Sequence, residues 1–140
     1  MKRTKKNNKG FSLVELIVVV LIMAIIAVAL APQVMKWVNE SRKSADASTY
    51  DSVVAAAQDA LANEDVWKEV TGGTDFTITI NTTEVTNGGG NLFKAEFNKQ
   101  IGGNPKSIKL KQSGATATVT IKAADGTVER TAEPTVGAGN

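Results

Sequence analysis

The run from Phe11 to Ala31 constrains this chain more than any other part of its sequence. It holds a single charged side chain, Glu15, among about 21 otherwise apolar or small residues. As an α-helix this run would be roughly 32 Å long, enough to cross a bilayer core of about 30 Å. We therefore expect a transmembrane helix, and the carboxylate near its start requires an explanation.

Basic residues gather in front of the apolar run. Five of the 16 Lys and Arg residues precede it: Lys2, Arg3, Lys5, Lys6 and Lys9. Basic residues beside a transmembrane segment stay on the cytoplasmic side, which predicts the N-terminus inside and the remainder outside the cytoplasmic membrane. The rest of the chain is net acidic. We therefore expect no nucleic-acid-binding head, because such a domain needs positive charge gathered on a folded face.

The sequence contains neither Cys nor His, which excludes disulfides and the chemistry of thiolates and imidazoles. Carboxylates remain as candidates, and their spacing is typical of a solvated helix surface: Asp46, Asp51, Asp59, Glu64, Asp65 and Glu69. No catalytic constellation is visible. We expect no enzymatic activity, no metal site and no cofactor.

The segment KGFSLVELIVVVLIMAIIAVALAP, which begins at Lys9, resembles the N-terminus of type IV pilins and type II secretion pseudopilins. Their pattern is a short basic leader ending in Gly, followed by Phe, Ser or Thr, Leu, a hydrophobic residue and Glu. With Phe11 counted as the first mature residue, Glu15 is the fifth and Pro32 the twenty-second, and both are characteristic positions. The resemblance covers about residues 5–60.

This resemblance implies a role for four residues. Gly10 would be the last leader residue, read by a prepilin peptidase on the cytoplasmic face. Phe11 would become the new, N-methylated terminus, and Glu15 would be required for assembly by meeting the Phe11 ammonium of a neighbouring subunit. Pro32 would lie where pilin helices melt locally in the filament.

The resemblance also implies partners and a location. The partners are further copies of the chain in a helical filament, the prepilin peptidase, an inner-membrane assembly platform and the membrane itself. The location is the bacterial cytoplasmic membrane before assembly and a cell-surface filament afterwards.

Physical arguments support the role of Glu15 independently. A carboxylate inside a membrane helix costs about 2.5–3.5 kcal/mol on insertion scales and usually marks function. Pairing with an amine recovers part of this cost, and a wrong register leaves a buried unpaired charge. Alternatively, or in addition, Glu15 lies close enough to the cytoplasmic interface to reach water. Pro32 removes a backbone hydrogen bond, so a simple kink at the membrane exit is the alternative to local melting.

Beyond the apolar run, the absence of Gly and Pro from Gln33 to about Asn63 predicts that the helix continues. Val54, Ala57 and Leu61 form an apolar face at helical spacing. The stretch from Ser41 to Thr49 is polar all round, and we expect it to be exposed or thinly packed. A second short helical piece is expected to end at Gly72-Gly73.

Strand patterns dominate the rest of the chain. Alternating apolar residues predict strands at 76–80, 108–110, 115–121 and after Asp125-Gly126, a pair that favours a type I′ hairpin turn. Ser113-Gly114 is the expected turn of the preceding hairpin. Residues 92–101 fit either a short helix or a strand, and residues 133–140 resemble a loose tail.

The predicted fold class is α+β, a long N-terminal helix with a membrane-spanning first half packed on a small antiparallel β-meander, as in pilins. The expected divisions are a prepilin leader at 1–10, a transmembrane or filament-core helix at 11–32, its amphipathic continuation at 33–71 and a globular β-rich head at 72–140.

The favoured function is that of a structural filament subunit, a type IV pilin cleaved after Gly10. A pseudopilin of type II secretion or of competence remains open within this class. A single-pass anchored binding module, whose β-domain holds a surface ligand, is an alternative from another class.

Secretion after cleavage at an Ala-x-Ala site, Ala27–Ala29 or Ala29–Ala31, is a third possibility. The apolar run is longer than the 7–15 residues of a signal peptide. This reading also leaves Glu15 and the Gly10–Phe11 junction unexplained. The freed domain would have a marginal core.

Overall fold

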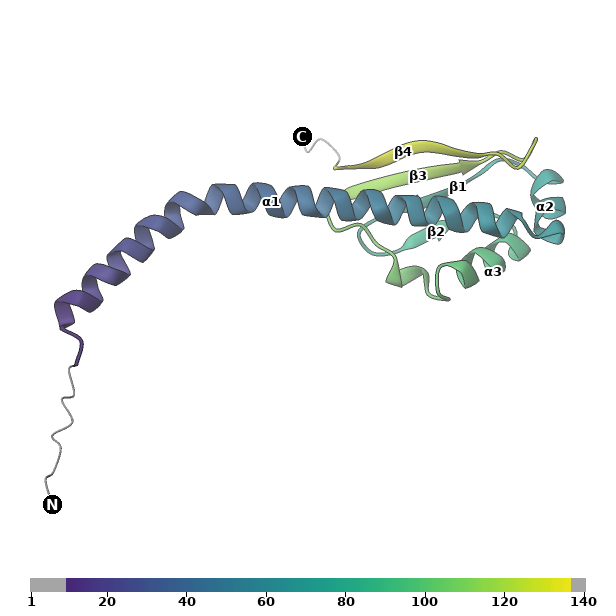
Figure 1. Ribbon diagram of the computed structural model, residues 1–140. Coiled ribbons are helices and arrows are strands. Elements are labelled where there is room, and N and C mark those ends of the chain that lie inside the picture. The colour runs from purple at the N-terminus through teal and green to yellow at the C-terminus, as the bar shows by residue number, and fades with distance from the viewer. Residues whose placement is uncertain (1–9, 137–140) are drawn as a thin grey trace, which may run out of the picture. The chain divides into compact units, whose positions relative to one another are not determined.

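The computed structural model describes residues 10–136, and the contacts divide the chain into two compact units, Met1–Val38 and Asn39–Asn140. Figure 1 shows the elements of both units. We call the described part of the second unit, residues 39–136, the head unit. The leader expected at 1–10 lies outside the described residues, except for Gly10.

Helix α1 (Leu13–Leu61) is 49 residues long and belongs to both units. Ala62 and Asn63 connect it to the second helix, α2 (Glu64–Thr71). Asn63 is the N-cap of α2, and its side chain accepts a hydrogen bond from the Asp65 amide at 3.0 Å. The helical region expected between Gln33 and Gly72 therefore consists of the rest of α1 and a separate short helix.

Four antiparallel strands form one sheet: β1 (Phe76–Ile80), β2 (Val85–Asn87), β3 (Ala115–Ile121) and β4 (Val128–Val136). Their order is β2-β1-β3-β4, so the third strand returns to the open side of the first. Ile78 accordingly faces Asn87 on one side and Val119 on the other. Helix α3 (Asn91–Gln100) and the short 3₁₀ helix η1 (Pro105–Ser107) lie in the connection between the two hairpins.

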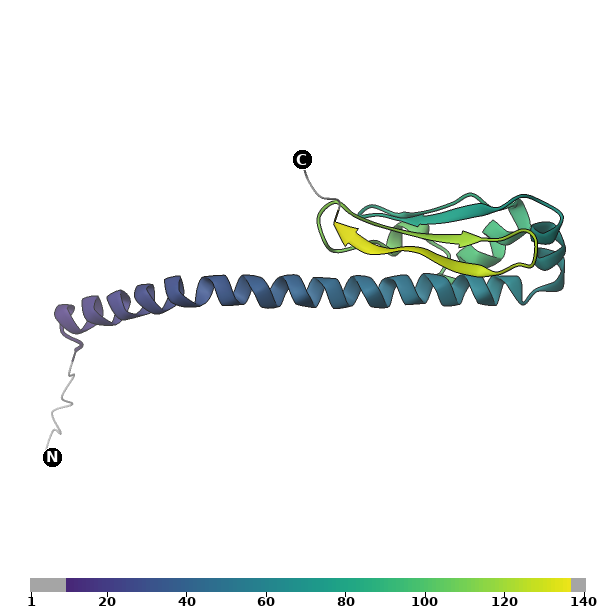
Figure 2. The ribbon, with the colours of Figure 1, turned by 90° about the horizontal axis from the view of Figure 1, so that it is seen from above.

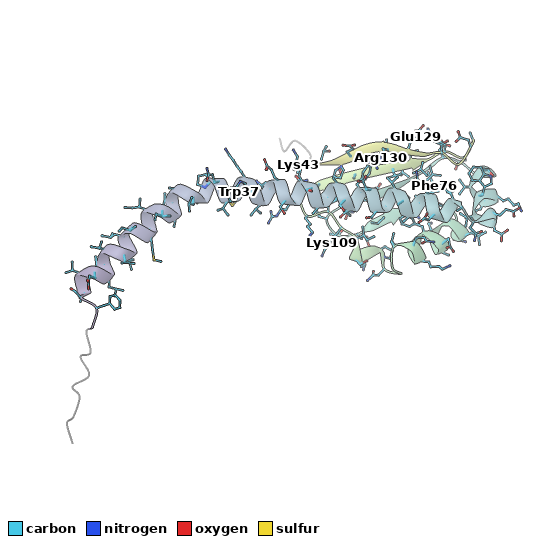
Figure 3. The ribbon with its side chains drawn as sticks, in the orientation of Figure 1. Trp37, Lys43, Phe76, Lys109, Glu129 and Arg130 are labelled. Atoms are coloured by element: carbon cyan, nitrogen blue, oxygen red, sulfur yellow. The ribbon has the colours of Figure 1, made fainter. Side chains whose placement is uncertain are left out.

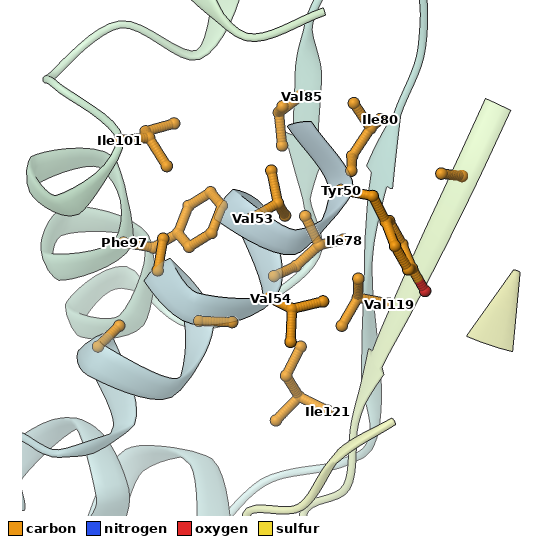
Figure 4. Packing of buried hydrophobic residues seen from close by; sticks show 14 of the residues in the cluster. Tyr50, Val53, Val54, Ile78, Ile80, Val85, Phe97, Ile101, Val119 and Ile121 are labelled. Carbon is orange, nitrogen blue, oxygen red and sulfur yellow. The ribbon is translucent and has the colours of Figure 1, made fainter. Parts of the chain in front are cut away.

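The core of the head unit lies between the sheet and the last turns of α1. Strands β1 and β3 alternate between buried and more exposed residues, as expected for a sheet with one face covered. Ile78 and Val119 pack from the sheet and Val53 from α1, and all three are fully buried (Figure 4). Figure 2 shows the strands running along the part of α1 that belongs to this unit. The predicted fold class is confirmed.

Residues 92–101, which the sequence left open, are mainly helical. Phe93 and Phe97 are four residues apart on α3 and fully buried, with ring centroids 5.9 Å apart. Phe93 also packs edge-to-face on Phe76 of β1, at 4.9 Å between centroids. The four-residue spacing favours the helix over the strand, because in a helix it places both aromatic rings on one face, toward the same core.

The predicted strand at 108–110 is wrong. This segment is irregular, and its backbone groups bond to different elements instead of forming a ladder with one neighbour. The Leu110 amide donates to the Asn81 carbonyl at 2.9 Å, and the next two amides, of Lys111 and Gln112, donate to Asp46. Ser113-Gly114 is consequently not a hairpin turn, and the place beside β3 that the missing strand would have taken is occupied by β1.

Two further details near the C-terminus differ from expectation. The β3–β4 hairpin forms, but not through a type I′ turn, because Gly126 has a φ of +65° and no non-glycine residue in the described part of the chain has a positive φ. The Lys122 amide instead donates to the Thr127 carbonyl across a longer loop. The expected loose tail at 133–140 is strand up to Val136, which lies opposite Ala115. Residues 137–140 lie outside the described part.

Candidate functional site

The four residues singled out by sequence lie on or directly before α1. Gly10 and Phe11 precede the first turn, and the Phe11 side chain is 92 % exposed. Glu15 lies in the first turn, whereas Pro32 lies inside the helix, which continues through it. Gly10, Phe11 and Glu15 therefore lie at the N-terminal end of α1, whereas Pro32 lies several turns further along the helix.

The side chains of Ser12 and Glu15 both accept hydrogen bonds from backbone amides at the start of α1. The Ser12 amide donates to Glu15 Oε2 at 2.9 Å, and the Val14 amide donates to Ser12 Oγ at 3.4 Å. A Ser followed three residues later by Glu is the sequence of a capping box, which satisfies amides that have no partner inside the helix. Glu15 therefore caps the start of α1 within the single chain. The sequence analysis did not predict this role, although the pattern Ser12-x-x-Glu15 indicates it.

The part of α1 within the first unit exposes its apolar side chains on every face. The exposed fractions include 73 % for Leu13, 70 % for Ile25 and 76 % for Val28. In the described residues α1 is the one helix long and apolar enough to cross a membrane, with a mean hydropathy of 3.2 in its most apolar window. A surface of this kind calls for lipid or for other apolar helices as its surroundings.

Asp46 contradicts the expectation that the carboxylates of 46–69 form a solvated surface. Its side chain is fully buried. It accepts hydrogen bonds from the backbone amides of Lys111 and Gln112 at 2.6 and 3.0 Å, and from Gln112 Nε2 at 3.1 Å. The carboxylate therefore serves to hold the 108–112 segment against α1.

Glu69 is a second carboxylate with a structural role. Gly90, the N-cap of α3, has no side chain to offer, and Glu69 accepts the first amides of α3 instead, from Leu92 at 3.1 Å and Phe93 at 2.9 Å. The hydrogen bond from Phe93 is the main reason why the pKa of Glu69 is lowered. Among residues 10–136, no three carboxylates gather where they could hold a metal ion.

Comparison with known protein families found one match. Residues 5–31 match the family described as the prokaryotic N-terminal methylation motif. The match includes Gly10, Phe11 and Glu15 and ends before Pro32, so it covers less than the 5–60 expected from the resemblance. Searches among curated proteins and among solved structures gave no match.

The start of this chain thus carries a prokaryotic N-terminal methylation motif, which confirms the resemblance noted in the sequence. The motif supports a precursor of the type IV pilin-like or pseudopilin class.

Proposed function

We propose that this chain is the precursor of a structural filament subunit, a type IV pilin. In this proposal a prepilin peptidase cuts between Gly10 and Phe11, and Phe11 becomes the N-methylated terminus. The mature subunit then polymerises through α1 into a surface filament. The head unit has a structural role and performs no catalysis.

The observation that carries the proposal is a carboxylate at the start of α1, in the otherwise apolar run from Phe11 to Ala31, all of whose residues are exposed. Glu15 is hydrogen-bonded to the Ser12 amide of its own helix. This bond lowers the cost of keeping the charge in a stored, unassembled subunit, because the carboxylate has a partner there. Cleavage before Phe11 creates an ammonium group two residues from the α1 N-terminus, which is the partner that Glu15 of a neighbouring copy requires.

Assembly follows from the surroundings that α1 needs. In the membrane its apolar side chains face lipid, and in the filament they face the same helix of other copies. Both states bury the apolar surface, so an unpaired charge decides which register of helices is stable. We propose that the Glu15–Phe11 pair sets this register, and that local melting near Pro32 adjusts the helix length in the packed filament.

The proposal places the precursor in the bacterial cytoplasmic membrane with its N-terminus inside and the head unit outside. The partners are copies of the same chain, the peptidase and an assembly platform in that membrane. A surface pilus is the role we propose, and a pseudopilus of secretion or competence is the alternative. Sheared surface filaments that contain the chain would support the pilus.

The decisive experiment compares two variants that break the same capping box. Glu15→Gln removes the charge, whereas Ser12→Ala removes the hydrogen bond from the Val14 amide and leaves the charge in place. Filaments sheared from cells are quantified by immunoblot, and the N-terminal mass of the subunit is measured. We expect a Phe11 terminus that is methylated in the parent, normal membrane insertion in both variants, and filaments with Ser12→Ala but not with Glu15→Gln.

Three results would contradict the proposal. A mature chain that still begins at Met1 would favour the anchored binding module. A chain that begins near residue 30 would favour a cleaved secretory signal. Normal filaments from Glu15→Gln would show that the charge has no part in assembly.

A further inference from the structure

A cleft in the head unit is lined by positive charge. It has a volume of about 540 Å³ and lies between α1 and residues 107–111, which run from the end of η1 into the irregular segment. We call it the cationic cleft, after its three basic residues Arg42, Lys109 and Lys111. None of their three charged groups has a carboxylate within 4 Å in the described residues, where the ion pairs all involve other basic side chains. No acidic side chain among residues 10–136 lines the cleft.

Three of the four hydroxyl groups in the cleft, all but that of Thr82, are already engaged within the chain. Thr49 and Ser52 donate to carbonyls one turn earlier in α1, at 2.9 Å each, and Ser107 donates to the Asn104 carbonyl at 2.7 Å. The attraction of the cleft for a ligand therefore rests mainly on its three cations. This favours an acidic partner that offers several carboxylates over a small ligand that needs many hydroxyl donors.

Acidic side chains collect at the opposite end of the head unit. We call this the acidic end, and it consists of Asp59, Glu64, Asp65 and Asp125, all exposed. Asp59 lies near the end of α1, the next two in the first turn of α2 and Asp125 in the β3–β4 loop. Of the four, Glu64 alone has a basic partner within 4 Å in the part of the chain described, Lys68 at 2.7 Å. Figure 3 shows Lys43 and Lys109 at one end of the head unit, and Figure 1 shows α2 at the other.

The two charged regions are too far apart to neutralise each other within one chain. Arg42 and Asp59 both lie on α1, and a rise of 1.5 Å per residue puts about 26 Å of helix between them. The screening length at physiological ionic strength is about 8 Å. The opposite charges therefore interact only when a second molecule brings one to the other.

We propose that the cationic cleft receives the acidic end of a second copy of this chain. The inference deepens the proposed function, on which it rests, by naming a contact between successive heads in the filament. The contact is heterologous, since each copy uses a different surface as donor and as acceptor. Heterologous contacts that do not close into a ring generate open helical filaments. Charge complementarity of this kind also suppresses wrong registers, because a displaced head meets like charge.

Charge reversal on each side, alone and together, tests the contact. The cleft variant is Lys109→Glu with Lys111→Glu, and the acidic-end variant is Asp59→Lys with Asp65→Lys. A matched control, Lys94→Glu with Lys99→Glu, makes the same change of charge on α3, at residues that belong to neither region. Circular dichroism of the purified full-length chain in detergent confirms that each variant is folded, and sheared filaments are quantified as for Glu15.

We expect each reversal to lower the filament yield about tenfold, which corresponds to the loss of a few exposed ion pairs. The control should keep the yield of the parent. The variant that carries all four substitutions should recover most of the filament yield, because the cleft and the acidic end again have opposite charges.

The outcomes separate this inference from the proposed function. No filaments from the parent chain would overturn the proposed function and this contact with it. Filaments from the parent together with unchanged yields from both reversals would overturn the contact alone. A cleft variant that fails and is not rescued by the acidic-end reversal would also overturn it, and would indicate another anionic ligand.

Discussion

The carboxylate of Asp46 accepts a hydrogen bond of 2.6 Å from the backbone amide of Lys111, 65 residues further along the chain. The same carboxylate accepts the amide of Gln112 at 3.0 Å. A buried carboxylate is costly unless such donors surround it, and buried amides are costly without an acceptor. The buried carboxylate and the buried amides therefore each supply the hydrogen-bond partner that the other needs. Together they join the polar part of α1 to the segment before β3.

Replacing Asp46 should destabilise the head unit strongly. Asp46→Ala leaves two backbone amides without their acceptor, and we expect the free energy of unfolding to fall by about 2–4 kcal/mol. Urea unfolding of the full-length chain in detergent, followed by circular dichroism, measures the change. Asp59→Ala, an exposed carboxylate on the same helix, is the control and should stay within about 0.5 kcal/mol of the parent. Equal losses in the two variants would show that the buried contact contributes little.

Glu69 should make the head unit sensitive to acid. Its pKa lies below the ordinary value of 4.5 because it accepts the Phe93 and Leu92 amides as a carboxylate. A lowered pKa gives stability that is present above the unfolded pKa and is lost as the pH falls through the folded one. Glu69→Gln should cost about 1 kcal/mol at pH 7, as the loss of a helix cap does. It should also make the unfolding midpoint less dependent on pH below about 4.5.

A pH series of urea midpoints for the parent and for Glu69→Gln provides the measurement. Glu64→Gln is a suitable control, because Glu64 pairs on the surface with Lys68. If the two variants had the same pH profile, the cap on α3 would not be the source of the acid sensitivity.

Tyr50 should contribute to the loss of stability of the head unit at alkaline pH. Its hydroxyl donates to the Thr118 carbonyl at 3.0 Å, and burial is the main reason why its pKa is raised above 10.0. A raised pKa means that the stability gained is present below pH 10 and is lost as the pH rises through the folded pKa. Tyr50→Phe should cost about 1 kcal/mol at pH 7 and remove this part of the alkaline decline. The measurement is the difference in free energy of unfolding between parent and variant from pH 8 to 11, in which the titration of lysines cancels. A difference that stays constant over this range would refute the prediction.

Gly126 should tolerate no side chain. It has a φ of +65°, and a Cβ there would run into the Trp67 ring. Gly102 has a similar φ of +83° but open space around it, so Gly102→Ala measures the backbone strain alone. We expect about 1 kcal/mol of destabilisation for Gly102→Ala and roughly twice that for Gly126→Ala. The second variant should also shift the tryptophan emission to the red, and equal effects at both positions would argue against the contact with Trp67.

Much of the fold was predictable wherever neighbouring residues in the sequence decide the structure. The length of the apolar run predicts a long helix, the alternation at 76–80 and 115–121 predicts strands, and the spacing of Phe93 and Phe97 indicates the helical face. The motif around Gly10, Phe11 and Glu15 also lies within one short segment. The capping box between Ser12 and Glu15 is equally local, and its pattern was overlooked rather than hidden.

Other features depended on partners that lie far away in the sequence. The segment at 108–110 alternates like a strand, yet its Leu110 amide bonds to Asn81 while those of the next two residues bond to Asp46. Asp46 itself sits in a polar stretch typical of an exposed surface. It is buried in the folded chain, where Lys111 and Gln112 bond to it.

The sequence by itself determined the N-terminal motif, the long helix and the apolar faces, because these follow from residue spacing and from the cost of exposing apolar surface. The tertiary structure decided the order of the strands, the buried role of Asp46, the cap that Glu69 places on α3 and the separation of charge between the two ends of the head unit. These features pair groups from distant segments, and a hydrogen bond or a charge has an effect only once folding has brought its partner near or kept it away.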